Sequence, residues 1–105
     1  RDPFLLKGMG EAVDRLVLAR SRGETVCVYG DYDVDGVTAT ALLTSFFRQI
    51  GIRCFYYIPN RLEEGYGLSA DGLRRAAGKA QVVVSVDCGV NAVAEAELAA
   101  RLGLD

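Results

Sequence analysis

The chain has 105 residues, half of them hydrophobic and a quarter charged, with a formal net charge of −2 and no histidine. This composition is typical of one folded domain, argues against disorder and shows no general nucleic-acid-binding surface. The absence of histidine excludes imidazole acid–base catalysis and imidazole metal ligation within these residues. No apolar run reaches the about 18 residues of a spanning helix, and no signal-peptide pattern is present, so we expect a cytoplasmic protein.

Hydrophobic periodicity divides the chain into alternating helices and strands. Helices are expected at about 9–22, 37–50, from the N-cap Ser69 to 77 and at 91–102, and strands at about 25–30, 52–58 and 81–86. This alternation predicts βαβαβ connections with right-handed crossovers. The expected fold is therefore α/β, with a three-layer Rossmann-like parallel sheet of at least three strands.

The helices and the N-terminal segment differ in how much apolar surface they are expected to bury. Residues 1–8 are expected to be irregular, with two leucines that dock on the body. Helix 9–22 should bury a face that includes Val17. Helix 37–50 is apolar on nearly all sides, which predicts that a sheet covers one face and further protein covers much of the other.

Four aspartates are predicted to meet at one edge of the sheet. Asp31, Asp33 and Asp35 lie in the stretch GDYDVDG after the first strand, and Asp87 follows the third. If the first strand lies between the other two, the edge between strands one and three is a topological switch point, where ligands bind in open α/β sheets. Carboxylates at this density repel one another unless cations or hydrogen bonds compensate, and oxygen-only ligand sets favour Mg²⁺ or Mn²⁺.

Other interpretations of these carboxylates have specific requirements. Asp35 alone could be a helix N-cap, and Asp31 and Asp87 could be turn residues, but turn chemistry gains nothing from four carboxylates at one edge. A calcium-binding EF-hand loop needs a downstream glutamate where this chain has Leu42. A dinucleotide site needs a glycine-rich loop without repelling acids, and a phospho-acceptor receiver domain needs further βα units and a later lysine.

The three cysteines give no sign of a disulfide framework or a zinc site. Cys27, Cys54 and Cys88 are odd in number, lie in or beside predicted strands and lack CxxC spacing. They are predicted to be buried free thiols, and only Cys88, next to Asp87, has a functional context.

Several stretches resemble a known family. GDYDVDG after a hydrophobic strand, IPNRLEEGYGL in the middle, VVVSVDCGV about fifty residues after the first motif and the opening DPFLLKGMGEAVDRL occur in this order. Together they resemble the DHH phosphoesterase superfamily and, within it, the RecJ single-stranded-DNA-specific exonucleases. The resemblance covers nearly the whole chain.

The resemblance implies metal-dependent hydrolysis of phosphodiesters from the 5′ end of single-stranded DNA, in recombination and repair, with Mn²⁺ or Mg²⁺. In the family pattern Asp33 and Asp35 match the Asp-x-Asp of the first motif, and Asp87 matches the second-motif aspartate that bridges two metals. Asp31 matches a further acidic position. Some members have a histidine where this chain has Tyr29.

A basic position is also implied in the IPNR-like stretch. Arg61 matches it and is the candidate for holding a substrate phosphate. The alternative is a surface arginine paired with Glu63 or Glu64.

The same resemblance predicts that residues 1–105 are part of a DHH domain. QIGIR at 49–53 and RLGLD at 101–105 share a pattern of helix end, glycine, apolar residue and charge, so residues 104–105 are expected to begin a fourth strand. The Asp-His-His motif should follow that strand, with the rest of the catalytic domain and a nucleic-acid-binding domain beyond it. We therefore expect this piece alone to bind metal weakly and to lack nuclease activity. The alternative function is a DHH-type phosphoesterase of small substrates such as cyclic dinucleotides, oligoribonucleotides or pyrophosphate.

Overall fold

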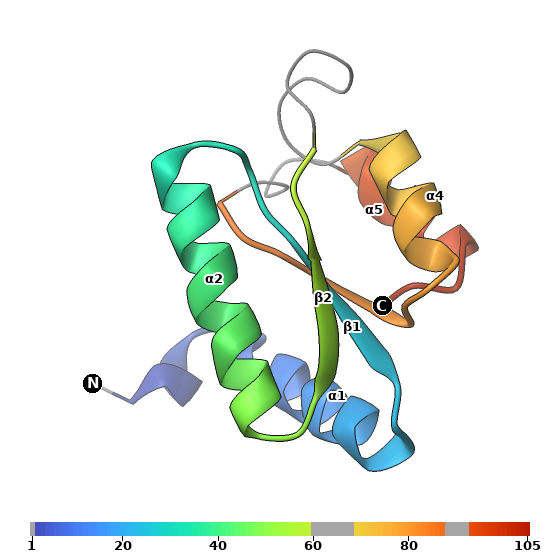
Figure 1. Ribbon diagram of the computed structural model, residues 1–105. Helices are drawn as coiled ribbons and strands as arrows, with labels where there is room; N and C mark the ends of the chain where they lie inside the picture. Colours follow the sequence, from blue (N-terminus) through green and yellow to red (C-terminus); the bar gives the residue numbers. More distant parts are fainter. Residues whose placement is uncertain (1, 60–68, 88–92) are drawn as a thin grey trace.

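The computed structural model describes residues 2–59, 69–87 and 93–105 (Figure 1). Its elements are η1 (Pro3–Leu5), α1 (Met9–Arg22), β1 (Thr25–Tyr29), α2 (Val34–Gln49), β2 (Arg53–Tyr57), α4 (Ala70–Ala77), β3 (Val82–Ser85) and α5 (Val93–Arg101). The predicted succession of helices and strands is confirmed, and no element end differs from its predicted position by more than three residues.

The three strands form one parallel sheet in the order β2-β1-β3. β1 is the central strand, with Tyr29 opposite Tyr57 on β2 and Ser85 on β3. The predicted α/β class and the predicted parallel sheet are confirmed, and the central position of β1 makes its carboxyl end the switch point.

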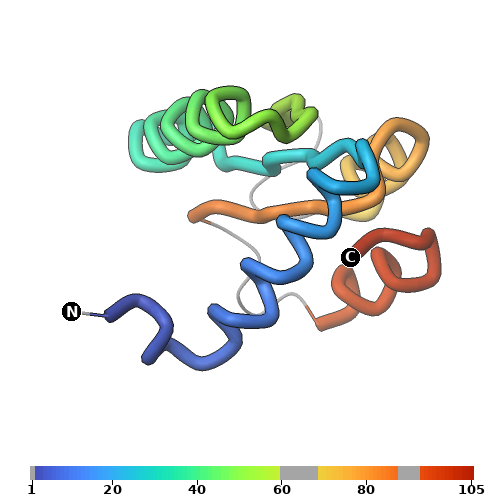
Figure 2. The backbone as a smooth tube through the Cα atoms, turned by 90° about the horizontal axis from the view of Figure 1, so that it is seen from below, coloured from blue at the N-terminus to red at the C-terminus, as the bar shows by residue number. Residues whose placement is uncertain are grey.

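Alternate side chains of β1 point to opposite faces of the sheet and give two cores. Val26 and Val28 contact Ala19 of α1 and Phe47 of α2 on one face. On the other face, Cys27 is buried in a second core, to which α4 and α5 contribute side chains. Figure 2 shows the two pairs of helices on opposite sides of the sheet, which gives the predicted three layers.

Two predictions about which apolar side chains are buried were wrong. The leucines of the N-terminal segment do not dock, because Leu5 and Leu6 are 77% and 65% exposed. On α1 the fully buried residue is Ala19, whereas Val17 is 59% exposed, since the helix meets the sheet mainly through its C-terminal half.

The outer face of α2 is only partly covered by the described residues. Leu42 and Phe46 are 73% and 51% exposed, while Phe47 on the sheet side is buried. The prediction that a sheet covers one side of this helix is confirmed, and cover on its other side stays a prediction.

The backbone of Asp105 pairs with β3 on the edge away from β1. Its N–H donates to the carbonyl of Gln81 at 3.0 Å, and its carbonyl accepts from the N–H of Val83 at 2.7 Å. This is the hydrogen-bond pattern of a parallel pair, as expected if residues 104–105 begin a strand.

Two buried threonines of α2 provide a matched test of its internal hydrogen bonding. The Thr40 hydroxyl donates to the Gly36 carbonyl at 2.7 Å, whereas the Thr44 hydroxyl has no partner among the described residues. We expect Thr40→Val to lower the free energy of unfolding by about 1 kcal/mol, because a hydrogen bond is lost. Thr44→Val should leave it unchanged or raise it by up to about 1 kcal/mol, because an unsatisfied buried hydroxyl is removed. Urea unfolding of both variants measures the difference, and equal losses would contradict the assignment.

Candidate metal centre

The carboxyl ends of β1 and β3 lie side by side and set the position of the acidic residues. Tyr29 is opposite Ser85, so two residues further along each chain Asp31 and Asp87 come at the same level. Pairing continues past the strand ends, since the Val86 N–H donates to the Tyr29 carbonyl at 2.9 Å. The predicted approach of the two acidic segments therefore follows from the register of the sheet.

The start of α2 differs from the prediction. The helix begins at Val34 instead of residue 37, because the Asp33 carboxylate accepts from the Gly36 N–H at 2.8 Å and caps it. Asp33, and not Asp35, is thus the N-cap. Asp35 lies exposed in the first turn, where the helix dipole stabilises a negative charge.

Asp31 is held beneath the first turn of α2. Gly36 allows this close approach, because a Cβ there would overlap the backbone of Asp31. Asp31 is only 7% exposed, and its carboxylate accepts from the Tyr32 N–H at 2.8 Å. One carboxylate oxygen of Asp31 and one of Asp33 are therefore bound to backbone N–H groups, which leaves a second oxygen on each.

Asp87 faces Asp33 across the gap between the strand ends. The pKa of the Asp87 carboxyl is raised above its ordinary value, and the largest cause is the negative charge of Asp33. A hydrogen bond between the two carboxyl groups is the second cause, and the charges of Asp35 and Asp31 add further repulsion. Its backbone is left-handed, with φ of 56°, a conformation that among non-glycine residues is enriched in Asp and Asn. The four predicted aspartates therefore lie near enough to interact.

The chemistry of this donor set fits a hard divalent cation, because carboxylate oxygens are its preferred ligands and a cation would relieve the repulsion at Asp87. Within residues 2–59, 69–87 and 93–105, however, no three His, Cys, Asp or Glu side chains are arranged as they stand to hold a metal ion. The backbone hydrogen bonds of Asp31 and Asp33 explain part of this.

Sequence reasoning missed a link between the central strand and α4. The Tyr29 side chain is fully buried, and its hydroxyl lies 3.1 Å from the Ser69 hydroxyl and accepts the Ser69 N–H at 3.1 Å. Ser69 also caps α4, as predicted, by accepting from Gly72 at 3.0 Å. The available signal was a tyrosine in an apolar strand, since a buried phenol needs a polar partner.

Other predicted residues fall into two groups. Cys27 is a buried free thiol, as predicted, and burial raises its pKa to about 12, so it stays protonated and unreactive. Cys54 is also free and is half-buried. Arg61, its possible partners Glu63 and Glu64, and Cys88 lie outside the described residues.

Comparison with known proteins identifies similar sequences and a similar fold. Residues 25–105 match the family model described as DHH family, N-terminal domain. The chain is 42% identical over 105 residues to the single-stranded-DNA-specific exonuclease RecJ of Bacillus subtilis and 41% identical over 101 residues to that of Escherichia coli. These matches cover 99% and 94% of this chain but only 13% and 18% of the relatives.

A solved structure with the same arrangement is that of RecJ from Thermus thermophilus in complex with Mn²⁺. It matches with a TM-score of 0.79 and 29% sequence identity, over 95% of this chain and 14% of that one. The predicted resemblance and fold are confirmed by these matches. No helix among the described residues is long and apolar enough to cross a membrane.

The repulsion at Asp87 predicts how stability depends on pH when metal is removed. The unfolded chain loses this proton at the ordinary carboxyl pKa, whereas the folded chain holds it to a higher pH. Stability is therefore lost as pH rises through this window, and Asp87→Asn removes the loss. Asparagine also tolerates the left-handed backbone.

We expect Asp87→Asn to be more stable than the parent chain at about pH 7, but not at about pH 3, in urea unfolding with a chelator present. Asp71→Asn is the control, because Asp71 is exposed and paired with Arg74 instead of with carboxylates. A lower stability of Asp87→Asn than of the parent at about pH 7 would show that the carboxylates do not repel.

Proposed function

Because this chain belongs to the DHH family, we propose that it supplies part of the metal-binding face of an exonuclease that hydrolyses single-stranded DNA from the 5′ end. The observation that carries the proposal is the interaction of Asp87 with Asp33 across the ends of β3 and β1. Similarity to RecJ proteins over nearly the whole chain supports this substrate over small phosphodiesters. Recombination and repair of DNA would place the protein in the cytoplasm.

The proposed ligands have distinct roles. Asp87, which interacts with Asp33, would be the carboxylate shared by two ions, with Asp35 as a further carboxylate on the α2 side. Asp31, which is buried and bound to its own loop, supports the loop and is the weaker ligand candidate. When bound, Mn²⁺ or Mg²⁺ stabilises the attacking and leaving oxygens and lowers the pKa of a bound water.

The surrounding chain keeps these carboxylates in position. The cap at Asp33 fixes the loop to the start of α2, and the close contact between Gly36 and Asp31 holds the first turn of that helix against the loop. Arg61, in the segment that follows β2, is proposed to hold a phosphate of the substrate, since a guanidinium binds phosphate oxygens in pairs.

The metal proposal is tested by titrating Mn²⁺ into the 105-residue chain by calorimetry. We expect weak binding, and at least about tenfold weaker binding in Asp33→Asn and in Asp87→Asn. Asparagine is also a good N-cap, so Asp33→Asn keeps the start of α2. Asp71→Asn is the control and should bind as the parent does. Equal affinity in all four proteins would contradict the assignment of Asp33 and Asp87.

The activity proposal is tested with a longer protein that contains this chain and an Asp-His-His motif, which a chain without histidine cannot contain. That protein should degrade 5′-phosphorylated single-stranded DNA with Mn²⁺ and lose this activity in Asp87→Ala, whereas the 105-residue chain alone should not. Robust cleavage by the isolated chain that Asp87→Ala removes would contradict the view that further residues are needed. Hydrolysis of a cyclic dinucleotide but not of DNA would favour the small-substrate alternative.

A further inference from the structure

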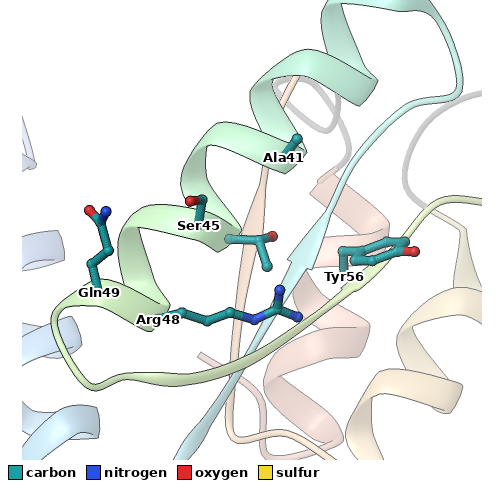
Figure 3. Close-up of a pocket in the computed structure, with 6 residues that line it drawn as sticks. Ala41, Ser45, Arg48, Gln49 and Tyr56 are labelled. Atoms are coloured by element: carbon teal, nitrogen blue, oxygen red, sulfur yellow. The ribbon is translucent and has the colours of Figure 1, made fainter.

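A hollow of about 500 Å³ lies between α2 and the outer strand β2, outside the acidic edge (Figure 3). It is lined by Ala41, Thr44, Ser45, Arg48, Gln49 and Tyr56. None of these six residues is acidic. The hollow therefore combines the positive charge of Arg48, the hydroxyl of Ser45 and the aromatic ring of Tyr56, at a place where the sequence motifs gave no candidate.

Arg48 is a cation without a counter-charge in the described part of the chain. Arg15 forms ion pairs with Glu24 and Asp105, and Arg74 with Asp71, but Arg48 forms none. Figure 3 shows its guanidinium extending from the end of α2 towards Tyr56, while Gln49 points away. Its charge is available for an anionic ligand.

Tyr56 presents an aromatic ring to solvent at the edge of the sheet. It is 59% exposed, and it shares with Cys54 the face of β2 that lies under α2. The neighbouring tyrosine, Tyr57, points to the other face of the sheet. Its ring packs against the Tyr29 ring, with 5.2 Å between the two ring centroids. Tyr56 is thus not part of that aromatic contact and offers a flat surface beside a guanidinium.

Thr44 lines the hollow, but its hydroxyl is not one of the polar groups that a ligand could reach. The residue is 4% exposed, and its hydroxyl has no partner among the described residues. This hydroxyl is enclosed by the protein, so the polar groups that the hollow offers to a ligand are the exposed Ser45 hydroxyl and the Arg48 guanidinium.

We propose that this hollow is a second contact for single-stranded nucleic acid, in which Arg48 binds a phosphate and a base stacks on Tyr56. The proposal rests on the proposed function and adds to it a site on the opposite half of α2. Single-stranded nucleic acid satisfies both features, because its phosphates are anionic and every base has a face that stacks on an aromatic ring. An acidic peptide would pair with Arg48 but would leave the Tyr56 ring without a specific partner.

The position of the hollow predicts which substrates depend on it. Asp33 caps α2 and Arg48 lies 15 residues later, so about 22 Å separates them along the helix. A strand cleaved at the acidic edge reaches the hollow only with nucleotides distant from the reacting phosphate. The contact should therefore raise affinity for long strands and leave the cleavage of a dinucleotide unchanged.

The test uses the longer protein that carries this chain and the fluorescence anisotropy of labelled oligothymidylates of 4 and 30 nucleotides, with a chelator present. Arg48→Ala and Tyr56→Ala should each weaken binding of the long strand by about tenfold. Arg48→Ala should also reduce the slope of log affinity against log salt by about 0.7, the value for one phosphate on a single strand. Tyr56→Phe should bind as the parent does, because stacking is kept.

Matched controls separate the hollow from general surface effects. Arg101→Ala removes another exposed arginine in the last turn of a helix, and Phe4→Ala removes an aromatic ring that is 57% exposed. Both should bind the long strand as the parent does. Arg48→Ala and Tyr56→Ala should also cleave a dinucleotide at the parental rate, whereas Asp87→Asn should lose cleavage without losing the contribution of the hollow to binding.

The outcomes distinguish this proposal from the proposed function. Unchanged binding of the long strand by Arg48→Ala and Tyr56→Ala, in a protein that binds and cleaves DNA, would overturn the hollow alone. A protein that binds neither oligothymidylate would overturn both. A larger loss of affinity for a polyglutamate peptide than for the long oligothymidylate would assign the hollow to a protein partner and overturn the nucleic-acid contact.

Discussion

The parallel pairing of β1 with β3 brings negative charges together that would otherwise repel. With Tyr29 opposite Ser85, the segments that hold Asp31 and Asp87 must leave the sheet side by side. The buried valines on β1 and the helices on both faces stabilise this pairing, so the core opposes the repulsion at its edge. The repulsion at this edge raises the pKa of Asp87, and a bound cation would relieve it.

Contacts with several elements hold the acidic loop after β1 in place. The Asp33 cap ties the loop to α2, and the close contact of Gly36 with the backbone of Asp31 leaves no room for a side chain between helix and loop. On the other face Tyr29 connects the central strand to Ser69 at the start of α4. The starts of α2 and α4 are thus both held against the carboxyl end of β1 or the loop that follows it.

The fold and the approach of the carboxylates could be predicted because they depend on periodicity and on strand ends. The exact start of α2 could not, because Asp33 and Asp35 are both possible caps and only the bond to Gly36 decides between them. The contact between Tyr29 and Ser69 joins residues 40 positions apart, which no local pattern encodes. The exposure of Leu5 and Leu6 shows that an apolar residue near a core need not enter it.

The central claim is that the two acidic segments together form one cation-binding site. It is tested most directly by adding Mn²⁺ to the ¹⁵N-labelled 105-residue chain and following paramagnetic broadening of the backbone amide resonances. The account predicts that resonances of residues 31–36 and 85–87 broaden together at the lowest Mn²⁺ concentrations, before those of residues 48–53 at the other end of the sheet. Broadening of only one acidic segment, or equal broadening throughout the chain, would contradict it.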